Sequence, residues 1–171
     1  MIFMSERLVY SGWLKLYKRL IGNKEYEILK NHDAVSAIVL NEFDEILLVK
    51  QFRPSVMRET LEIPAGVLDI TGEPEESCII RELEEETALK VEKNNLQRIV
   101  SYKPILGFSV SNMTIFKTRI KKDDFNSSKI KDVDVTEGIW LSFEELEDKI
   151  NSGEIVDDKT IMSYFHLKSS N

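Results

Sequence analysis

The pattern of hydrophobic and polar positions in the first thirty residues predicts two β-strands, at residues 8–20 and 26–30. The segment Gly22-Asn23-Lys24 between them is typical of a turn. A strand pair of this size has too little apolar surface to be stable alone. We therefore expect it to pack on its own domain or on a partner subunit.

Two continuous apolar runs follow, at residues 34–40 and 45–51, and they predict strands of a sheet that is covered on both faces. Shorter strands are predicted at residues 61–63, 96–102, 114–120 and 139–141. Together these segments predict a sheet of several strands, preceded by the separate strand pair of the N-terminus.

Helices are predicted at residues 74–89, from the capping box Ser142-Phe143-Glu144-Glu145 to about Ile150, and from Asp157 or Asp158 onwards. Residues 121–135 are polar, and we interpret them as a mobile loop. Strands flanked by helices favour an α/β/α sandwich around a mixed sheet. The length of 171 residues predicts a single domain.

The helix at residues 74–89 has a high density of acids, with seven glutamates between Glu73 and Glu86. On a helical wheel Glu82, Glu85 and Glu86 fall within one arc of roughly a quarter turn. The adjoining arc is filled by Ile79, Ile80, Leu83 and Thr87. These three acids therefore border a buried stripe and can face a cleft, whereas the remaining helix acids are interpreted as surface residues.

Three carboxylates in one arc repel one another, and Arg81 alone cannot neutralise them. Clustered carboxylate oxygens are the ligands that Mg²⁺ or Mn²⁺ prefers, above all when a substrate phosphate completes the coordination shell. The preceding segment Pro64-Ala65-Gly66 can add a backbone carbonyl. The sequence thus predicts a divalent-metal site.

Composition narrows the class of protein further. The net charge of −7 argues against a nucleic-acid surface, because phosphate backbones require clustered Lys and Arg. No stretch approaches the ~20 apolar residues that span a bilayer, and the N-terminus has no basic region followed by an apolar one. The single cysteine, Cys78, excludes an internal disulfide. We expect a cytoplasmic protein without membrane or nucleic-acid partners.

The segment from Gly66 to Leu89 resembles the Nudix box, G-x5-E-x7-R-E-U-x-E-E-x-G-U, where U is aliphatic. The matching positions are Gly66, Glu73, Arg81, Glu82, Leu83, Glu85, Glu86 and Leu89. Six residues instead of five separate Gly66 from Glu73, which lengthens a loop and leaves the helix register intact. Ala88 replaces the family's glycine, so the helix end is expected to be looser or differently shaped.

This resemblance implies the Nudix fold and roles for individual residues. Glu82 and Glu86 would be the principal metal ligands, with the Ala65 carbonyl completing one ion and Glu85 sharing or orienting a second. Glu73 and Arg81 would form a supporting ion pair that fixes the helix against the loop.

Segments outside the box resemble the ADP-ribose pyrophosphatase branch of the family. They are Gly12-Trp13-Leu14-Lys15-Leu16, Val49-Lys50-Gln51-Phe52-Arg53-Pro54, Leu61-Glu62-Ile63-Pro64-Ala65-Gly66, Phe108-Ser109 and Asp157-Asp158-Lys159-Thr160. The branch is a homodimer whose N-terminal strands are exchanged between subunits. The resemblance therefore implies a dimer arm at residues 1–31 and a catalytic core at residues 32–171, with the box at residues 66–89.

Carried over by position, Trp13 and Tyr26 would stack on the adenine, Arg53 would bind phosphate, and Phe108 and Ser109 would line the substrate pocket. Each of these assignments has an alternative. The aromatic side chains can instead be buried in the dimer contact, and Arg53 can form a surface salt bridge.

The branch takes its general base from the loop before the last strand, and the corresponding residue is Asp134. Because aspartate is one methylene shorter than the family's glutamate, Asp132 or Glu137 remains an alternative. The implied reaction is Mg²⁺-dependent hydrolysis of ADP-ribose to AMP and ribose 5-phosphate. Two alternatives remain open: another nucleoside diphosphate, such as a nucleotide sugar or an oxidised nucleotide, and an ADP-ribose sensor without catalysis.

Overall fold

The computed structural model describes residues 4–170, which form a three-stranded sheet and a seven-stranded sheet. The large sheet has the order β10-β5-β4-β9-β8, with β6 added beside β5 and β7 beside β4. Its strands are β4 (Ala34–Leu40), β5 (Ile46–Arg53), β6 (Arg58–Glu62), β7 (Ala65–Val67), β8 (Gln97–Tyr102), β9 (Met113–Arg119) and β10 (Val135–Leu141). Because β4 and β9 pair in parallel and the other pairs are antiparallel, the predicted mixed sheet is confirmed.

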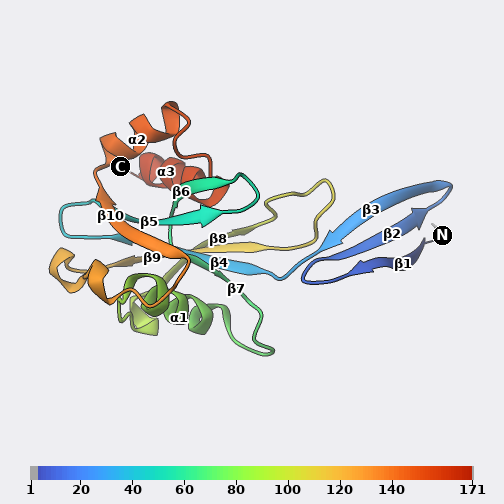
Figure 1. The fold of residues 1–171 in the computed structure, drawn as a ribbon, viewed down its shortest axis with the longest axis horizontal. Helices are drawn as coiled ribbons and strands as arrows, with labels where there is room; N and C mark the ends of the chain where they lie inside the picture. Colours follow the sequence, from blue (N-terminus) through green and yellow to red (C-terminus); the bar gives the residue numbers. More distant parts are fainter. Residues whose placement is uncertain (1–3, 171) are drawn as a thin grey trace.

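Helices cover both faces of this sheet (Figure 1). Helix α1 (Glu75–Thr87) lies on one face, and α2 (Phe143–Asn151) and α3 (Asp158–Ser170) lie on the other. The side chains of β4 alternate between two cores, with Val35, Ala37 and Val39 on the α1 side and Ile38 and Leu40 on the other. All of β4 after Ala34 is buried, which explains why its sequence is apolar apart from Ser36.

The ends of the helices follow the predicted capping. The side chain of Ser142 accepts from the backbone of Glu145, and the Glu145 carboxylate accepts from the backbone of Ser142, so the capping box at the start of α2 is confirmed. At the start of α3, the carboxylate of Asp157 accepts hydrogen bonds from the backbone and the hydroxyl of Thr160. No helix within residues 4–170 has the length and apolar content needed to cross a membrane.

The N-terminal arm consists of β1 (Met4–Ser11), β2 (Lys15–Ile21) and β3 (Lys24–Lys30), so the prediction of one strand at residues 8–20 is wrong. The chain turns back at Gly12, whose N–H donates to the Leu14 carbonyl at 3.0 Å. The ring of Tyr10 lies over Gly12, so a Cβ atom at this position would require that exposed ring to move. The predicted turn between β2 and β3 is present, with Gly22 at φ +60°.

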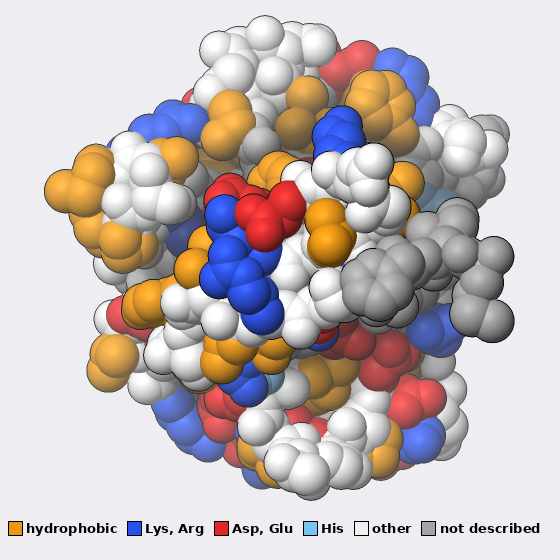
Figure 2. Space-filling model, turned by 90° about the vertical axis from the view of Figure 1, so that its right-hand side faces the viewer, with side chains coloured by type: hydrophobic (Ala, Val, Ile, Leu, Met, Phe, Trp, Pro, Cys, Tyr) orange, Lys and Arg blue, Asp and Glu red, His pale blue; other side chains and the backbone are white. Residues whose placement is uncertain are grey.

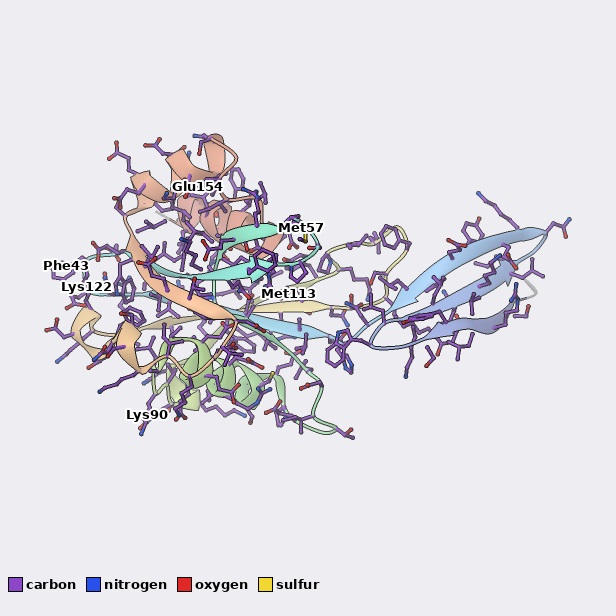
Figure 3. All side chains as sticks on the ribbon, viewed as in Figure 1. Phe43, Met57, Lys90, Met113, Lys122 and Glu154 are labelled. Carbon is purple, nitrogen blue, oxygen red and sulfur yellow. The ribbon has the colours of Figure 1, made fainter. Side chains whose placement is uncertain are left out.

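The arm extends away from the core, and its side chains point outward from both faces of a single sheet layer (Figures 1 and 3). It is joined to the core by backbone hydrogen bonds between Leu29 and the loop at Phe108 and Val110, 2.7 and 3.2 Å long. Several large apolar side chains on it are more than a third exposed, namely Leu8, Val9, Tyr10, Trp13, Leu14, Ile21 and Tyr26. A view along the arm shows such side chains interspersed with charged ones (Figure 2).

The polar segment between β9 and β10 contains two short 3-10 helices, η2 (Lys122–Asp124) and η3 (Ser127–Lys129); a third, η1 (Lys93–Asn95), precedes β8. The ring of Phe125 packs edge-on against Trp140, with centroids 6.0 Å apart, in space that a Cβ atom on Gly138 would fill. Near its other end, the N–H groups of Lys131 and Asp132 donate to the Glu85 carbonyl at 2.9 and 3.0 Å. The predicted loop is therefore attached at both ends, while its mobility stays a prediction.

Candidate active site

Helix α1 is preceded by a loop that contains the extra residue of the box. Gly72 in this loop adopts φ +82°, and Glu73 still reaches Arg81, so the helix register is intact as predicted. At the other end, Ala88 takes up the left-handed conformation at φ 58°, and its N–H donates to the Glu84 carbonyl at 3.1 Å. The expectation of a differently shaped helix end is therefore wrong, because alanine adopts the conformation that glycine would favour.

Glu82 lies against the backbone of Gly66. A Cβ atom on Gly66 would overlap the Glu82 carboxyl group, so glycine is required here for its lack of a side chain and not for its backbone angles. Burial raises the pKa of Glu82, and the charge of Arg81 partly opposes this rise. The first residue of the box thus creates the space that one of its acids occupies.

Glu86 is 4% exposed and accepts a hydrogen bond from the Ala65 N–H at 3.0 Å. Its pKa is raised to about 8, chiefly by burial and also by the charges of Glu82 and Asp132, whereas the bond from the Ala65 N–H lowers it. A carboxylate buried next to other carboxylates is unfavourable unless a cation joins them.

Glu73 and Glu85 surround Arg81. The Arg81 guanidinium donates to both oxygens of Glu73, at 3.2 and 3.1 Å, and the ion pair joins the helix to the preceding loop. The same guanidinium donates to Glu82 at 2.7 Å and to Glu85 at 3.4 Å. Glu85 is the most exposed of the three clustered acids. The positive charge of Arg81 thus partly compensates the negative charges of Glu73, Glu82 and Glu85.

The helical wheel predicted that Glu82, Glu85 and Glu86 border the buried stripe of α1, and the structure differs from this prediction. The buried residues of α1 are Cys78, Ile79, Glu82, Leu83, Glu86 and Thr87, whereas Ile80 is only half-buried. Glu82 and Glu86 therefore belong to the stripe itself, because the loop at Gly66 covers them.

These residues fit a divalent cation by their chemistry. Glu82 and Glu86 provide carboxylate oxygens, the charge of Glu82 is near enough to raise the pKa of Glu86, and the segment at Ala65 brings backbone beside Glu86. Among residues 4–170, no three carboxylate, imidazole or thiol groups are already gathered as a metal-holding set. In this arrangement Glu82 is turned toward Arg81 and Glu86 toward the Ala65 N–H.

Asp132 is the loop acid that interacts with this cluster, since its charge raises the pKa of both Glu82 and Glu86. Asp134 is exposed, and its backbone N–H donates to the Asp132 carboxylate at 2.7 Å. The sequence analysis named Asp134 first and Asp132 as an alternative. Sequence spacing could not separate them, because the hydrogen bonds to the Glu85 carbonyl determine which of the two faces α1.

Arg53 forms a salt bridge, but its partner is the buried Glu62, so the pair is not the surface salt bridge that was the alternative to phosphate binding. Its Nε and Nη2 atoms donate to the two carboxylate oxygens of Glu62 at 2.7 and 2.5 Å. The guanidinium is nevertheless close enough to Glu86 for the two charges to interact. Its side chain is 41% exposed, so it remains accessible to a ligand.

The predicted adenine-binding residues lie on the arm and are not adjacent. Trp13 is in the turn between β1 and β2, 62% exposed, with its ring tilted 41° against His32 at 4.7 Å. Tyr26 pairs with Arg19, four register positions beyond the pair of Lys15 and Lys30 that lies next to Trp13. One chain therefore does not bring the two aromatic rings onto the same ligand.

The other predicted pocket residues lie where the arm joins the core. Phe108 is half exposed, and its carbonyl accepts from the Leu29 N–H. Ser109 is buried, and its hydroxyl bonds to Ser111 at 2.8 Å and to Asn31 at 3.3 Å. These residues are separate from the acids of α1 in sequence and structure, and Ser109 is already engaged by neighbouring side chains.

Next to Glu86 lies a buried ionic network that was not predicted from the sequence. It consists of Arg53, Glu62, Asp157 and Lys159. Glu62 ends β6, and Lys159 is in the first turn of α3. The sequence predicts a strand and a helix at these segments, but neither prediction places their charged residues in the core. The available signals were a glutamate within a predicted apolar strand and a lysine in the first turn of a predicted helix, and both side chains prove to be buried.

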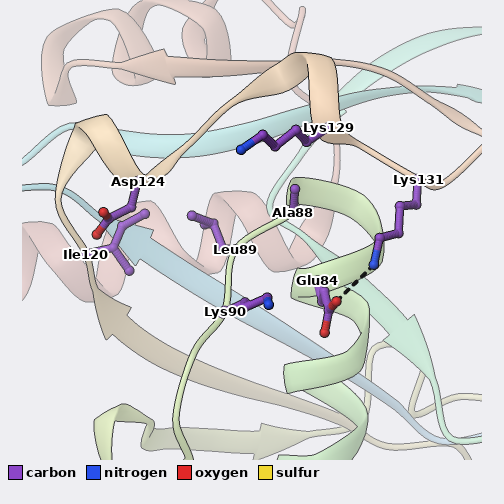
Figure 4. Close-up of a pocket in the computed structure, with 8 residues that line it drawn as sticks. All are labelled: Glu84, Ala88, Leu89, Lys90, Ile120, Asp124, Lys129 and Lys131. Carbon is purple, nitrogen blue, oxygen red and sulfur yellow. Dashed lines mark hydrogen bonds and ion pairs between the residues drawn. The ribbon is translucent and has the colours of Figure 1, made fainter.

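A cavity of about 660 Å³ lies at the C-terminal end of α1, away from the paired acids (Figure 4). It is lined by Glu84, Ala88, Leu89, Lys90, Ile120, Asp124, Lys129 and Lys131. Lys131 forms an ion pair with Glu84 at 2.9 Å across it. Helix α1 contributes Glu84 to this cavity and neither Glu82 nor Glu86, so the cavity is distinct from the acid cluster.

Comparison with known proteins agrees with this geometry. A model of the NUDIX domain matches residues 30–162, which include the whole of the large sheet, α1 and α2. The chain therefore belongs to the Nudix family and is a Nudix hydrolase. The match begins at the last residue of β3, so nearly all of the arm lies outside it.

Individual relatives extend the comparison. An ADP-ribose pyrophosphatase of Bacillus subtilis is 30% identical over 146 residues, which are 84% of this chain and 77% of that protein. A methanol dehydrogenase activator of Bacillus methanolicus is 28% identical over 144 residues, or 83% and 75%. An ADP-sugar pyrophosphatase of Mus musculus is 36% identical over 106 residues, or 60% and 47%.

Proposed function

We propose that this Nudix hydrolase cleaves the diphosphate bond of ADP-ribose to give AMP and ribose 5-phosphate. The observation that carries the proposal is the burial of Glu82 and Glu86 against Gly66 and Ala65, with Arg53 close enough to interact with Glu86. The similarity to the ADP-ribose pyrophosphatase of Bacillus subtilis supports this choice of substrate.

Glu82, Glu86 and the Ala65 carbonyl would hold Mg²⁺, for which Mn²⁺ can substitute, and Glu85 would share or orient a second ion. When bound, such a cation offsets charge on the diphosphate and lowers the pKa of the attacking water. The contribution of the chain is to keep the carboxylates under a glycine, where no side chain intervenes. Arg81 and Glu73 would hold α1 against the loop.

The substrate would be bound by Arg53 at the diphosphate, with Phe108 and Ser109 lining the pocket. Because one chain does not bring both rings onto one ligand, Trp13 and Tyr26 at the adenine would come from different subunits. Because the arm extends away from the core of its own chain, we propose a homodimer in which the arm of one subunit completes the site of the other (Figure 1). The exposed apolar side chains of the arm support this proposal, since a dimer contact would bury them. The expected location is the cytoplasm.

The general base is proposed to be a carboxylate of the segment before β10. The interaction of Asp132 with Glu82 and Glu86 favours Asp132 over Asp134 and Glu137. We expect Asp132→Asn to lower kcat by about a hundredfold and Asp134→Asn by less than about threefold. Full activity in Asp132→Asn together with a large loss in Asp134→Asn would restore the assignment made from sequence.

Product analysis tests the reaction itself. The protein is incubated with ADP-ribose and Mg²⁺, and the products are separated by ion-exchange chromatography. Equal amounts of AMP and ribose 5-phosphate support the proposal. Binding of ADP-ribose without release of AMP would instead indicate a sensor.

A second candidate substrate is another ADP-linked sugar, which the similarity to the mouse ADP-sugar pyrophosphatase favours. Parallel measurements of kcat/KM for ADP-ribose, ADP-glucose, GDP-mannose and 8-oxo-dGTP separate the candidates. A tenfold or greater advantage of one substrate would identify the preferred class.

A further inference from the structure

Arg53 uses only one edge of its guanidinium group in the salt bridge with Glu62. The bonds from Nε and Nη2 occupy one edge of the fork. Arginine has five N–H donors, so both hydrogens of Nη1 and the second hydrogen of Nη2 remain. Within residues 4–170 no other hydrogen bond of this side chain is present, and it lines a cavity of about 390 Å³. The unused edge has the geometry that binds phosphate oxygens in parallel.

Glu62 is held from every side. It is 3% exposed, and its carboxylate accepts two bonds from Arg53, one from Thr60 at 2.7 Å and one from Lys159 at 2.6 Å. Burial raises the pKa of Glu62, but the bonds from Arg53 and Lys159 outweigh this and bring it to about 2. Glu62 therefore stays ionised at neutral pH and fixes the orientation of Arg53.

Lys159 provides the charge that makes this arrangement possible. It is 4% exposed, and its ammonium group donates to Glu62 and, at 2.7 Å, to Asp157. Arg53 and Lys159 balance Glu62 and Asp157, so the network is neutral. Without Lys159 it would have one net negative charge next to Glu86, which would weaken the attraction of Arg53 for an anion.

We propose that Glu62 and Lys159 are positioning residues, which hold Arg53 with its unused edge available to the diphosphate of the substrate. This inference rests on the proposed function, because it assigns Arg53 to the substrate of that site. Neither residue touches the reacting atoms. Their effect is to orient the guanidinium and to keep its surroundings neutral before the substrate arrives.

The same network also holds α3 against the end of β6, and this structural role has to be distinguished from a role in substrate binding. The Thr160 hydroxyl accepts from the Ile63 N–H at 2.9 Å and donates to Asp157 at 2.6 Å, which connects α3 to the end of β6. A purely structural network would affect folding and kcat without a specific effect on substrate binding. The decisive measurement is therefore the change in KM that a substitution of Lys159 causes when Arg53 is present and when it is replaced.

The first variant is Lys159→Met, which keeps much of the side-chain volume and leaves Glu62 bonded to Arg53 and Thr60. We expect the KM for ADP-ribose to rise about tenfold while kcat changes by less than about threefold. The matched control is Lys168→Met on the same helix, where Lys168 forms an exposed ion pair with Glu147 at 2.8 Å. This control should leave both constants unchanged.

The second comparison combines Lys159→Met with Arg53→Met. If Lys159 acts through Arg53, the double variant should have a KM within about twofold of Arg53→Met alone. A full tenfold rise in the Arg53→Met background, or an unchanged KM in Lys159→Met, would overturn the positioning role. If Lys159→Met does not fold, Thr60→Val removes one bond to Glu62 without a change of charge, and it should raise KM about threefold; an unchanged KM in that variant contradicts the proposal.

Calorimetric titration with inorganic pyrophosphate keeps the two proposals separable. Lack of ADP-ribose hydrolysis by the unmodified protein would refute the proposed function alone. Pyrophosphate binding can still be compared in that case. We expect it to weaken about tenfold in Lys159→Met and to stay unchanged in Lys168→Met, and equal binding by both variants would refute the positioning role.

Discussion

Two acids of α1 and the aromatic side chains of the arm would form two parts of one site, yet the acids are buried by their own chain and the aromatic side chains are exposed on it. Glu82 and Glu86 are buried, and residues of the same chain hold them in place. Trp13 and Tyr10 are about 60% exposed on a single sheet layer. Under the proposed function, the metal-binding acids would therefore be positioned within one chain, whereas adenine recognition would depend on a surface that a second subunit covers.

The largest effect is expected when both buried acids are neutralised. Glu82→Gln combined with Glu86→Gln should lower kcat/KM by about a thousandfold or more, because the metal loses its principal ligands. Steady-state assays with ADP-ribose measure the loss. Glu76→Gln serves as the control, since Glu76 is a half-buried acid of the same helix that faces Lys93. Retained activity in the double variant would exclude the proposed metal site.

A smaller but still large effect is expected from Gly66→Ala. The added methyl group would displace the Glu82 carboxylate, and a displacement of about 1 Å can cost a hundredfold in rate. The comparison variant is Gly107→Ala, because a Cβ atom at Gly107 meets open space. Similar kcat values for the two variants would mean that Glu82 tolerates displacement.

The arm should respond differently from the core. We expect Trp13→Ala to raise KM for ADP-ribose about tenfold, with kcat and melting temperature nearly unchanged, because an exposed stacking residue is lost. Phe43→Ala removes an exposed aromatic side chain between β4 and β5, away from the arm, and is the control. Sedimentation velocity on each variant shows whether the dimer persists. An unaltered KM in Trp13→Ala would remove Trp13 from the adenine site.

The smallest effect concerns stability and pH. Because Glu86 has a pKa of about 8 in the folded protein and a lower one when unfolded, the folded state binds more protons between these values. Stability of the metal-free protein should therefore fall as pH rises from 6 to 8, with a decrease in Tm of about 5 °C. Glu62 makes no contribution in this range, since it is ionised in both states.

Glu86→Gln provides the check on this assignment, and thermal melting at several pH values is the measurement. The variant should flatten the pH dependence, whereas Glu76→Gln should preserve it. Saturating Mg²⁺ should raise Tm most at pH 8, because the cation binds the ionised carboxylates. A melting temperature that increases with pH in the metal-free protein would contradict the proposed origin in Glu86.

Local sequence signals predicted much of the fold. The apolar run of β4 and the capping box of Ser142 are complete within a few residues, and both elements have the predicted character. The prediction of one strand at residues 8–20 is wrong because the chain bends at Gly12, where its N–H donates to the Leu14 carbonyl between β1 and β2. The relation of Lys159 to Glu62 joins positions 97 residues apart, and no periodic pattern reports such a pair.

For the candidate site as well, local signals could be read from the sequence and contacts between distant segments could not. Spacing on the helix identified Glu82, Glu85 and Glu86, because α1 alone determines their relative positions. It could not predict that Glu82 and Glu86 are buried, which depends on the loop at Gly66. Nor could it choose between Asp132 and Asp134, since that choice depends on hydrogen bonds from the loop to α1.

The contact between Phe125 and Gly138 has a consequence for how the enzyme can vary. The segment after β9 is attached at Phe125 and again where Lys131 and Asp132 meet the Glu85 carbonyl. The number of residues between these attachments therefore sets which residue meets the Glu85 carbonyl and which acid faces α1. Insertions before Phe125 should leave this register unchanged, whereas insertions between Phe125 and Lys131 should shift it without altering any side chain of α1.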